Sequence, residues 1–491
     1  MDTGNDELFT MDTRQRVSLP PSAVPAGEAK RFRDYDQTQQ FLLPPSLDDW
    51  LTGDDEARFI SEIVEHVLDL TDIYASYENL RGGPPYEPAM MLKVLLYAYS
   101  TGITSSRKIE KACHRDIAFR WLTGNQTPDY RSLARFRKRH LNAVAGLFTQ
   151  VLAVCAQAGM VQLGRVALDG TKLDANASKH KAMSYDRMDT KIQALQSEVD
   201  SLLAAAEDTD EVEDAEYGHD QRGDEIPDEL RHRQRRIAKL KAAKADIETE
   251  AKARAAAKAR DKAAKKHASA EEQDTVAEEA AEKAVPQAKT QRNFTDPESR
   301  MMKTNHGFDY AYNGQAIVDE TAQVIITTDL TGKATDVQQL VPMHETMVDQ
   351  LAEADIDQHP GVFLGDAGYC SNANLTAAED LAGTVLVATG RERAGESFPG
   401  PDAPVPADAT VREAMAHRLR QPDDRAHYAR RKAIVEPVFG QMKTRQAAGQ
   451  LRLRGLAAVK CEWVLHAVCH NLRKLRAIAS FPPVIGAMAT T

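Results

Sequence analysis

The sequence contains no long apolar run. Across its 491 residues no stretch approaches the roughly 18 consecutive apolar residues that a membrane-spanning helix needs. The most apolar segment, Met90 to Tyr99, is short and contains Lys93. The N-terminal sequence MDTGNDELFTMDTRQR is acidic and polar, without the apolar region of a secretion signal. We therefore expect a cytoplasmic protein with no membrane partner.

Cysteine is also scarce, with five residues and no Cys-x-x-Cys pair. An odd number without paired spacing indicates reduced intracellular thiols. Cys461, His466, Cys469 and His470 lie close in the sequence, but their spacing is not that of a zinc site. Apolar residues at helical spacing in the same segment predict an amphipathic core helix instead: Leu465, Val468, Leu472 and Leu475.

The chain as a whole lacks a positive charge excess, because 62 Lys and Arg stand against 73 Asp and Glu, giving a formal net charge of −11. Two segments are nevertheless basic. Residues 104–147 hold 10 Lys or Arg against 3 Asp or Glu, and residues 425–476 hold 12 against 2. Much of the acidity lies at the N-terminus and in residues 207–229. This distribution predicts local binding to phosphate backbones, with solvated helix faces as the alternative.

Residues 1–40 are polar with scattered prolines and are expected to be a mobile segment. Residues 41–160 contain apolar residues at helical spacing, interrupted by turn signals. We predict helices over the ranges 55–70, 90–100, 105–116, 116–124 and 128–159. Several short helices with basic connections favour a small helical DNA-binding domain, although the pattern does not identify the helix that enters a groove.

A charged, helix-prone tract follows at 184–293. A seven-residue apolar repeat opens it, at Met188, Ile192, Leu195, Val199 and Leu202. The repeat continues beyond the acidic linker at Leu230, Ile237, Leu240 and Ile247. We predict an inserted helical hairpin with a coiled-coil seam, frayed toward its end near Val285. Three roles stay open for it: gripping DNA, contacting a second subunit, or none beyond a solvated surface.

The segments on both sides of this tract, 161–183 and 294–480, predict one α/β core with a mixed sheet. Buried strands are expected at 165–169, 361–366 and 384–390, and a β-hairpin at 308–320 and 322–332. Helices are expected at 337–355 and 372–381. In this order of elements, the strands at 165–169, 361–366 and 384–390 are expected to belong to the same sheet.

Three separated acids point to a metal site. Asp169 and Asp366 each close a short apolar strand, and Glu436 lies near the start of a predicted helix. Carboxylate oxygens on rigid elements are the ligands that Mg²⁺ prefers, and two divalent ions about 4 Å apart assist both sides of a phosphodiester displacement. Asp174, five residues after Asp169, should point to the opposite face of the strand. Asp336 is predicted to cap the helix at 337–355.

Around Glu436 the sequence also places Tyr428, Arg431 and Lys443. Because Pro is tolerated only in the first turn of a helix, Pro437 predicts that the helix begins near Glu436. Lys443 then lies two turns along the same face, where it would meet a phosphate while Glu436 holds a metal ion.

These stretches together resemble bacterial insertion-sequence transposases of the DDE class. The motifs VALDGTKLDANAS, GDAGYCS and RKAIVEPVFGQMK match the three acid-bearing motifs in order. The N-terminal part and the segment RGLAAVKCEWVLHAVCHNLRKL are also similar. The chain looks closest to the subgroup with a Tyr-Arg-Glu-Lys signature. It departs from that signature in one respect, because four residues rather than three separate Arg431 from Glu436; Arg430 or Lys432 could substitute for Arg431.

The resemblance implies a ribonuclease-H-like catalytic core with an all-α N-terminal domain and an inserted helical hairpin. It implies an enzyme that binds the terminal inverted repeats of a mobile element and uses two Mg²⁺ or Mn²⁺ ions to cleave DNA and transfer strands. Asp169, Asp366 and Glu436 would be the catalytic metal ligands, and Tyr428, Arg431 and Lys443 would bind double-stranded DNA. The active synaptic complex would be at least a dimer, at the nucleoid. Two alternatives stay open: a repurposed DNA-binding repressor and a plain nuclease with the same core.

Overall fold

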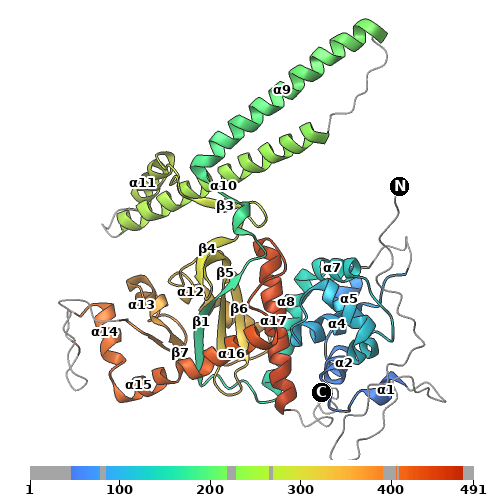
Figure 1. Cartoon of the computed structure of the whole chain (residues 1–491). Coiled ribbons are helices and arrows are strands. Elements are labelled where there is room, and N and C mark those ends of the chain that lie inside the picture. The colour runs from blue at the N-terminus through green and yellow to red at the C-terminus, as the bar shows by residue number, and fades with distance from the viewer. Residues whose placement is uncertain are drawn as a thin grey trace, which may run out of the picture. The chain divides into compact units, whose positions relative to one another are not determined.

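The computed structural model describes residues 46–77, 84–217, 228–264, 269–390, 405 and 409–478, with only the backbone described at 202–217, 228–230 and 264 (Figure 1). The chain divides into two compact units, Met1–Ser46 and Leu47–Thr491. All described helices and strands belong to the second unit. The segment 1–40, which the sequence predicts to be mobile, lies outside the described residues.

The N-terminal part of the second unit is built from helices, as the sequence predicts. They are α1 (Leu47–Trp50), α2 (Glu56–His66), α3 (Thr71–Ala75), α4 (Pro88–Ser100), α5 (Ser106–Arg115), α6 (Ile117–Leu122), α7 (Tyr130–Arg139) and α8 (Leu141–Gln157). Local sequence fixes several starts: Asp116 and Asp129 accept hydrogen bonds from the first-turn amides of α6 and α7.

One helix prediction here is wrong. The single helix expected at 128–159 is two helices, α7 and α8, which meet at an angle of 71°. The break falls at His140, whose backbone leaves the helical region and whose buried ring packs between Tyr77 and Phe136. Among the described residues no single helix has the length and apolarity to cross a membrane, and this bent pair passes the same test only by length and composition.

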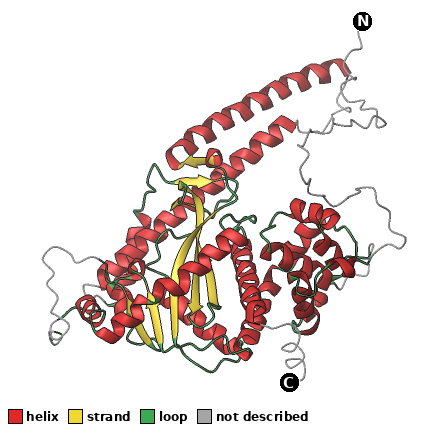
Figure 2. Ribbon diagram, turned by 60° about the horizontal axis from the view of Figure 1, so that its bottom comes forward, coloured by secondary structure: helices red, strands yellow, loops and turns green. Residues whose placement is uncertain are grey.

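A mixed sheet forms the centre of the remaining chain (Figure 2). Its strands are β1 (Arg165–Asp174), β4 (Arg300–Thr304), β5 (Gly307–Asp319), β6 (Ile325–Thr331), β7 (Val362–Gly365) and β8 (Thr384–Val387). The strand order is β4-β5-β1-β7-β8, with β6 also paired to β5. β1 runs antiparallel to β5 and parallel to β7, and β7 runs parallel to β8. This mixed sheet is compatible with a ribonuclease-H-like core, and β1 extends five residues beyond its predicted end.

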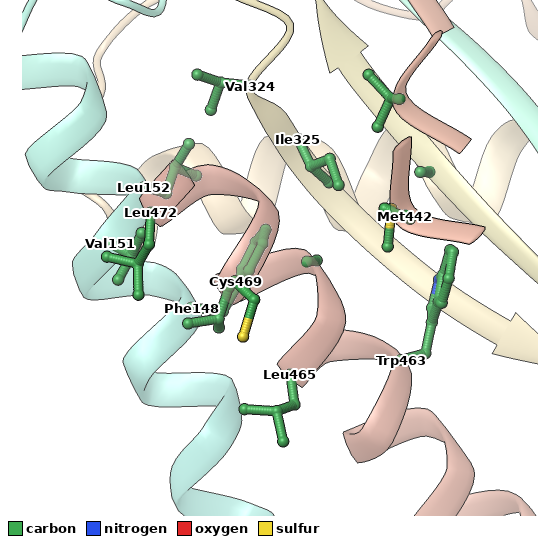
Figure 3. Packing of buried hydrophobic residues seen from close by; sticks show 14 of the residues in the cluster. Phe148, Val151, Leu152, Val324, Ile325, Met442, Trp463, Leu465, Cys469 and Leu472 are labelled. Atoms are coloured by element: carbon green, nitrogen blue, oxygen red, sulfur yellow. The ribbon is translucent and has the colours of Figure 1, made fainter. Parts of the chain in front are cut away.

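Helices cover the sheet (Figures 1 and 2). They are α12 (Leu340–Glu353), α13 (Asn372–Ala377), α14 (Val411–Arg418), α15 (Pro422–Ala429), α16 (Arg431–Arg445) and α17 (Leu456–Ile478). The predicted amphipathic core helix is α17. Its apolar residues Leu465, Cys469 and Leu472 face Phe148 and Val151 of α8, while the sheet edge at Ile325 lies close by (Figure 3). α17 therefore joins the N-terminal helices to the sheet.

In the tract at 184–293 two helices pack together through residues of the predicted seam, and the part expected to be frayed contains a third helix. These are α9 (Tyr185–Tyr217), α10 (Asp228–Ala264) and α11 (Ala270–Glu282), flanked by the paired strands β2 (Ala182–Ser184) and β3 (Gln291–Asn293). A small separate core joins α9 to α10 through Met188, Leu195, Val199, Ile237, Leu240 and Ile247. The seam residues Leu202 and Leu230 lie outside the described side chains. α11 is a helix of its own because Ser269 and Glu272 form a capping box.

Two buried histidines in α17 make the stability of the fold depend on pH. Burial lowers the pKa of His466 to about 3 and that of His470 to about 4, against an ordinary value of 6.5. The unfolded chain therefore binds more protons below pH 6.5 than the folded chain does. Stability is fully present above pH 6.5 and is lost as the pH falls, by up to about 1.4 kcal/mol per pH unit for each histidine.

We predict that His466→Phe weakens this pH dependence, because it removes one of the two buried imidazoles. Phe keeps a ring beside Tyr99, whose ring centroid lies 4.9 Å from that of His466. Urea unfolding between pH 5 and pH 7 should show a shallower slope for the variant, by up to about 1.4 kcal/mol per pH unit. Equal slopes for the two proteins would show that His466 titrates normally.

Candidate active site

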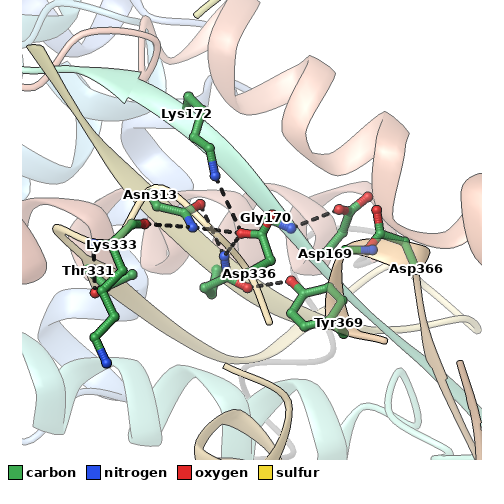
Figure 4. Close-up of polar contacts among 11 residues, drawn as sticks. Asp169, Gly170, Lys172, Asn313, Thr331, Lys333, Asp336, Asp366 and Tyr369 are labelled. Atoms are coloured by element: carbon green, nitrogen blue, oxygen red, sulfur yellow. Dashed lines mark hydrogen bonds and ion pairs between the residues drawn. The ribbon is translucent and has the colours of Figure 1, made fainter. Parts of the chain in front are cut away.

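Asp169 and Asp366 occupy equivalent positions on two neighbouring strands. Leu168 pairs with Gly365 in the parallel ladder of β1 and β7, and each acid is the next residue along its strand. Residues opposite each other on parallel strands point to the same face, so the side chains of Asp169, midway along β1, and Asp366, just after β7, lie close together, as Figure 4 shows. The charge of Asp366 helps to raise the pKa of Asp169. The two strands are neighbours, as the sequence prediction requires.

Asp169 is held between a backbone amide and a guanidinium. Its Oδ1 accepts a hydrogen bond from Gly170 N at 2.8 Å, and its Oδ2 accepts one from Arg431 Nη1 at 3.0 Å. The side chains of Asp169 and Arg431 are only 18% and 8% exposed. Burial raises the pKa of Asp169, and the nearby Arg431 opposes that shift. Arg431 thus supplies the positive charge that a half-buried carboxylate needs.

Arg431 is in turn surrounded by groups that favour its charged form. Burial alone would lower its pKa, but Asp169, Tyr428 and Asp366 together raise it. Tyr428, at the end of α15, is itself half-buried, and burial raises the pKa of its hydroxyl. The structure therefore brings Tyr428, Arg431, Asp169 and Asp366 into one group.

A short turn fixes Asp366. The side-chain Oδ1 of Asp366 accepts a hydrogen bond from Gly368 N at 2.8 Å and caps the 3-10 turn Ala367–Tyr369. A Cβ on Gly368 would lie 2.9 Å from the same Oδ1, so a larger residue would disturb this contact. The motif Gly-Asp-Ala-Gly-Tyr therefore forms a strand end followed by a rigid turn.

The predicted start of the helix carrying Glu436 is wrong. α16 begins at Arg431, with Pro437 in its interior. A proline cannot donate to the carbonyl four residues earlier, which here belongs to Ala433. That carbonyl instead accepts a hydrogen bond from Gln323 Nε2 at 2.9 Å. A side chain from the turn between β5 and β6 therefore compensates for the missing helix bond.

Glu436 is exposed on α16. Lys443, seven residues on and therefore on the same face, donates from Nζ to Lys172 O in β1 at 3.1 Å. Burial lowers the pKa of Lys443. Glu436 thus lies on the same side of α16 as Lys443, whose side chain reaches β1. Within the described part of the chain, no three Asp, Glu, His or Cys side chains are grouped closely enough to hold a metal ion. Convergence of Glu436 with Asp169 and Asp366 stays a prediction.

The predicted helix-capping role of Asp336 is also wrong. α12 begins at Leu340, and its cap residue Gln339 makes no side-chain capping bond. The carboxylate of Asp336 instead accepts hydrogen bonds from Asn313 Nδ2 at 2.6 Å and Gln315 Nε2 at 2.8 Å. Sequence reasoning missed this group. The available signal was the pair Asn313 and Gln315, two polar residues on one face of an otherwise apolar strand.

Asp174, the second acid of β1, has different neighbours. Burial is the main cause that raises the pKa of Asp174. The charged groups that also affect this pKa are Asp309, His306, Lys443 and Lys179. Its backbone pairs with the segment before α17, at Gln450. Asp174 therefore lies outside the group formed by Asp169 and Asp366, as the alternation of the strand predicts.

The Asp169–Arg431 pair should show strong energetic coupling. Arg431→Met leaves a poorly solvated carboxylate without its cation and should lower the free energy of unfolding by about 2–3 kcal/mol. In an Asp169→Asn background the same change should cost at least about 1 kcal/mol less. Urea unfolding of the four proteins of this double-mutant cycle measures the difference. Simple additivity of the two substitutions would contradict the pairing.

Two protein families match separate parts of the chain. The family described as "Transposase domain (DUF772)" matches residues 45–139, and the family described as "Transposase DDE domain" matches residues 285–472. The second range includes Asp366 and Glu436, whereas Asp169 lies outside both. No curated protein and no solved structure gave a significant match. The two ranges together cover more than half of the sequence, and the chain therefore belongs to the DDE transposases of insertion sequences.

Proposed function

We propose that this transposase cleaves DNA at the terminal inverted repeats of a mobile element and joins the freed ends to target DNA. The observation that carries the proposal is the equivalent position of Asp169 and Asp366 on paired parallel strands. Hydrolysis at each end frees a 3′-OH, which then attacks a phosphodiester of the target. Joining two ends requires both to be held at once, so the active complex contains at least two copies of the chain.

The domain organisation supports this proposal. The strand order β6-β5-β1-β7-β8, with an antiparallel half and a parallel half, favours a ribonuclease-H-like catalytic core at 161–183 and 294–480. The helical domain at 41–160 would bind DNA, and the tract at 184–293 is an insertion into the core. We also assign the chain to the Tyr-Arg-Glu-Lys subgroup, with the signature at Tyr428, Arg431, Glu436 and Lys443.

The donor set fits divalent cations of the Mg²⁺ or Mn²⁺ type. Asp169, midway along β1, and Asp366, directly after β7, offer hard carboxylate oxygens on rigid elements, and the proposed third ligand, Glu436, is exposed on α16. When bound, two such ions supply activation of the attacking oxygen and stabilisation of the leaving oxygen. DDE transposases as a family use divalent metal ions.

The basic residues of the site have separate proposed roles. Arg431 balances the charge of Asp169 in a half-buried position, and a guanidinium also matches the geometry of a phosphate. Lys443 is held against β1 and would meet the DNA backbone as a point charge. Tyr428, beside Arg431, would contact the same DNA strand.

The proposed surface for the terminal repeats lies on α5 and α7. The exposed residues of these two helices are strongly basic: Arg107, Lys108, Lys111 and Arg115 on α5, and Arg131, Arg135, Lys138 and Arg139 on α7. Arg107 and Arg131 both stack on the ring of Tyr130, which brings the two helices together. The opposite side of α7, at Leu133 and Phe136, is buried. One basic face of this kind fits a phosphate backbone.

Purified protein, labelled terminal-repeat DNA and Mg²⁺ or Mn²⁺ test the proposal. Asp169→Asn, Asp366→Asn and Glu436→Gln should each lower cleavage by more than about 100-fold, since loss of an outer-shell partner of a metal site alone typically costs 10- to 100-fold. All three should still bind the DNA. Asp174→Asn, a matched change on the same strand, should leave cleavage intact.

The result also separates the alternatives. Undiminished cleavage by the Asp366→Asn variant would contradict the assignment of the site. Tight DNA binding without nicking under any divalent ion would indicate a repressor. Cleavage without joining to target DNA would indicate a plain nuclease.

A further inference from the structure

A buried polar network lies directly behind the acid pair (Figure 4). Asn313 and Gln315 of β5 and Tyr369 are fully buried. Asp336 Oδ1 accepts hydrogen bonds from both amide groups and pairs with Lys172 at 3.4 Å. Buried polar groups of this kind are costly unless every member is bonded, and here they bond to one another. The proposed chemistry does not use these residues.

Asp336 determines how the amide of Gln315 is oriented. An ionised carboxylate only accepts hydrogen bonds, so Gln315 must turn its Nε2 toward Asp336 Oδ1, at 2.8 Å. The amide oxygen then faces Tyr369, whose hydroxyl donates to Gln315 Oε1. Burial and the neighbouring carboxylates raise the pKa of Tyr369, so it keeps the proton that it donates. The chain of donors runs in one direction, from the turn to Asp336.

The network reaches the Asp366 turn at two further points. Asn374 Nδ2 donates to Tyr369 O at 2.7 Å and to Val337 O at 2.6 Å, which ties the turn to the segment that carries Asp336. Asp336 Oδ2 and Asp366 Oδ1 lie 3.5 Å and 2.9 Å from the point that a Cβ on Gly368 would occupy. The backbone that positions Asp366 is thus fixed from behind by the Asp336 network.

The same network reaches Asp169 through Gly170. A Cβ on Gly170 would lie 2.7 Å from Asp336 Oδ1 and would also collide with the amide of Gln315. Only a residue without a side chain lets the Asp336 network approach β1 this closely. Gly170 N is also the donor to Asp169 Oδ1. Asp336 therefore packs against the backbone that orients one acid and is linked through Gln315 to the turn that orients the other.

We propose that Asp336 is a positioning residue for the metal site, which fixes Gln315 and Tyr369 and through them the separation of Asp169 and Asp366. This role of Asp336 depends on the proposed function in one respect, which is that Asp169 and Asp366 are metal ligands. In this proposal Asp336 acts through its Oδ1, which is occupied by the two amides and Lys172, and not as a metal ligand.

Binding of Mn²⁺, followed by the electron paramagnetic resonance signal of the free ion, tests this without any cleavage. Asp336→Asn removes the negative charge that holds both amides and Lys172 and should weaken Mn²⁺ binding about 10- to 100-fold, as loss of outer-shell partners typically does. Tyr369→Phe removes the hydroxyl that donates to Gln315 and should also weaken Mn²⁺ binding. Because both act through Gln315, the double variant should bind no more weakly than Asp336→Asn alone.

The matched control is Asp329→Asn on β6, which breaks an ion pair with Lys460 of α17 outside the hydrogen bonds of the network. It should leave Mn²⁺ binding unchanged, and thermal unfolding should show that all variants remain folded. If Asp336→Asn does not fold, Tyr369→Phe alone must weaken Mn²⁺ binding. Unchanged binding in Tyr369→Phe, equal effects of Asp336→Asn and Asp329→Asn, or no Mn²⁺ binding by the parent protein would each overturn the proposal. A parent protein that binds Mn²⁺ but does not cleave DNA contradicts only the proposed function.

Discussion

The parallel pairing of β1 with β7 is the constraint on which the site depends. Because Leu168 opposes Gly365, the residues that follow them meet at one edge of the sheet. A slip of one residue would turn every side chain of β1 to the other face and exchange Asp169 for an apolar neighbour. Val166, Ala167 and Leu168 of β1 are fully buried, so such a slip would move the charged Arg165 or Asp169 into the core. The hydrophobic pattern of the strands therefore fixes the position of the acids.

Two carboxylates brought together in a half-buried place repel each other, and the surrounding structure compensates. Arg431 supplies a positive charge to Asp169, a capped turn holds Asp366, and α16 carries the arginine into place despite Pro437. Each of these features joins segments far apart in the sequence. The insertion of α9 to α11 between β1 and β4 leaves the register intact, because its small core is separate from that of the sheet.

Much of this arrangement follows from the sequence, since short apolar strands ending in Asp and a β-branched hairpin are local signals. Asp169 and Asp366 could be paired in advance because each follows a short apolar run, although β1 continues past Asp169 to Asp174. Features that depend on tertiary contacts could not be predicted. The helix at Arg431 starts early because Gln323 bonds to a carbonyl in another element, and the long N-terminal helix breaks because His140 packs between two rings. Asp336 looks like a helix cap in the sequence, and its true partners lie in β5.

Shared metal ions between Asp169 and Asp366 can be observed in crystals of the protein with terminal-repeat DNA, soaked in Mn²⁺ and measured for anomalous scattering. We expect a peak within about 2–2.5 Å of oxygens from both Asp169 and Asp366. Peaks only elsewhere, for example between Asp174 and Asp309, would contradict it.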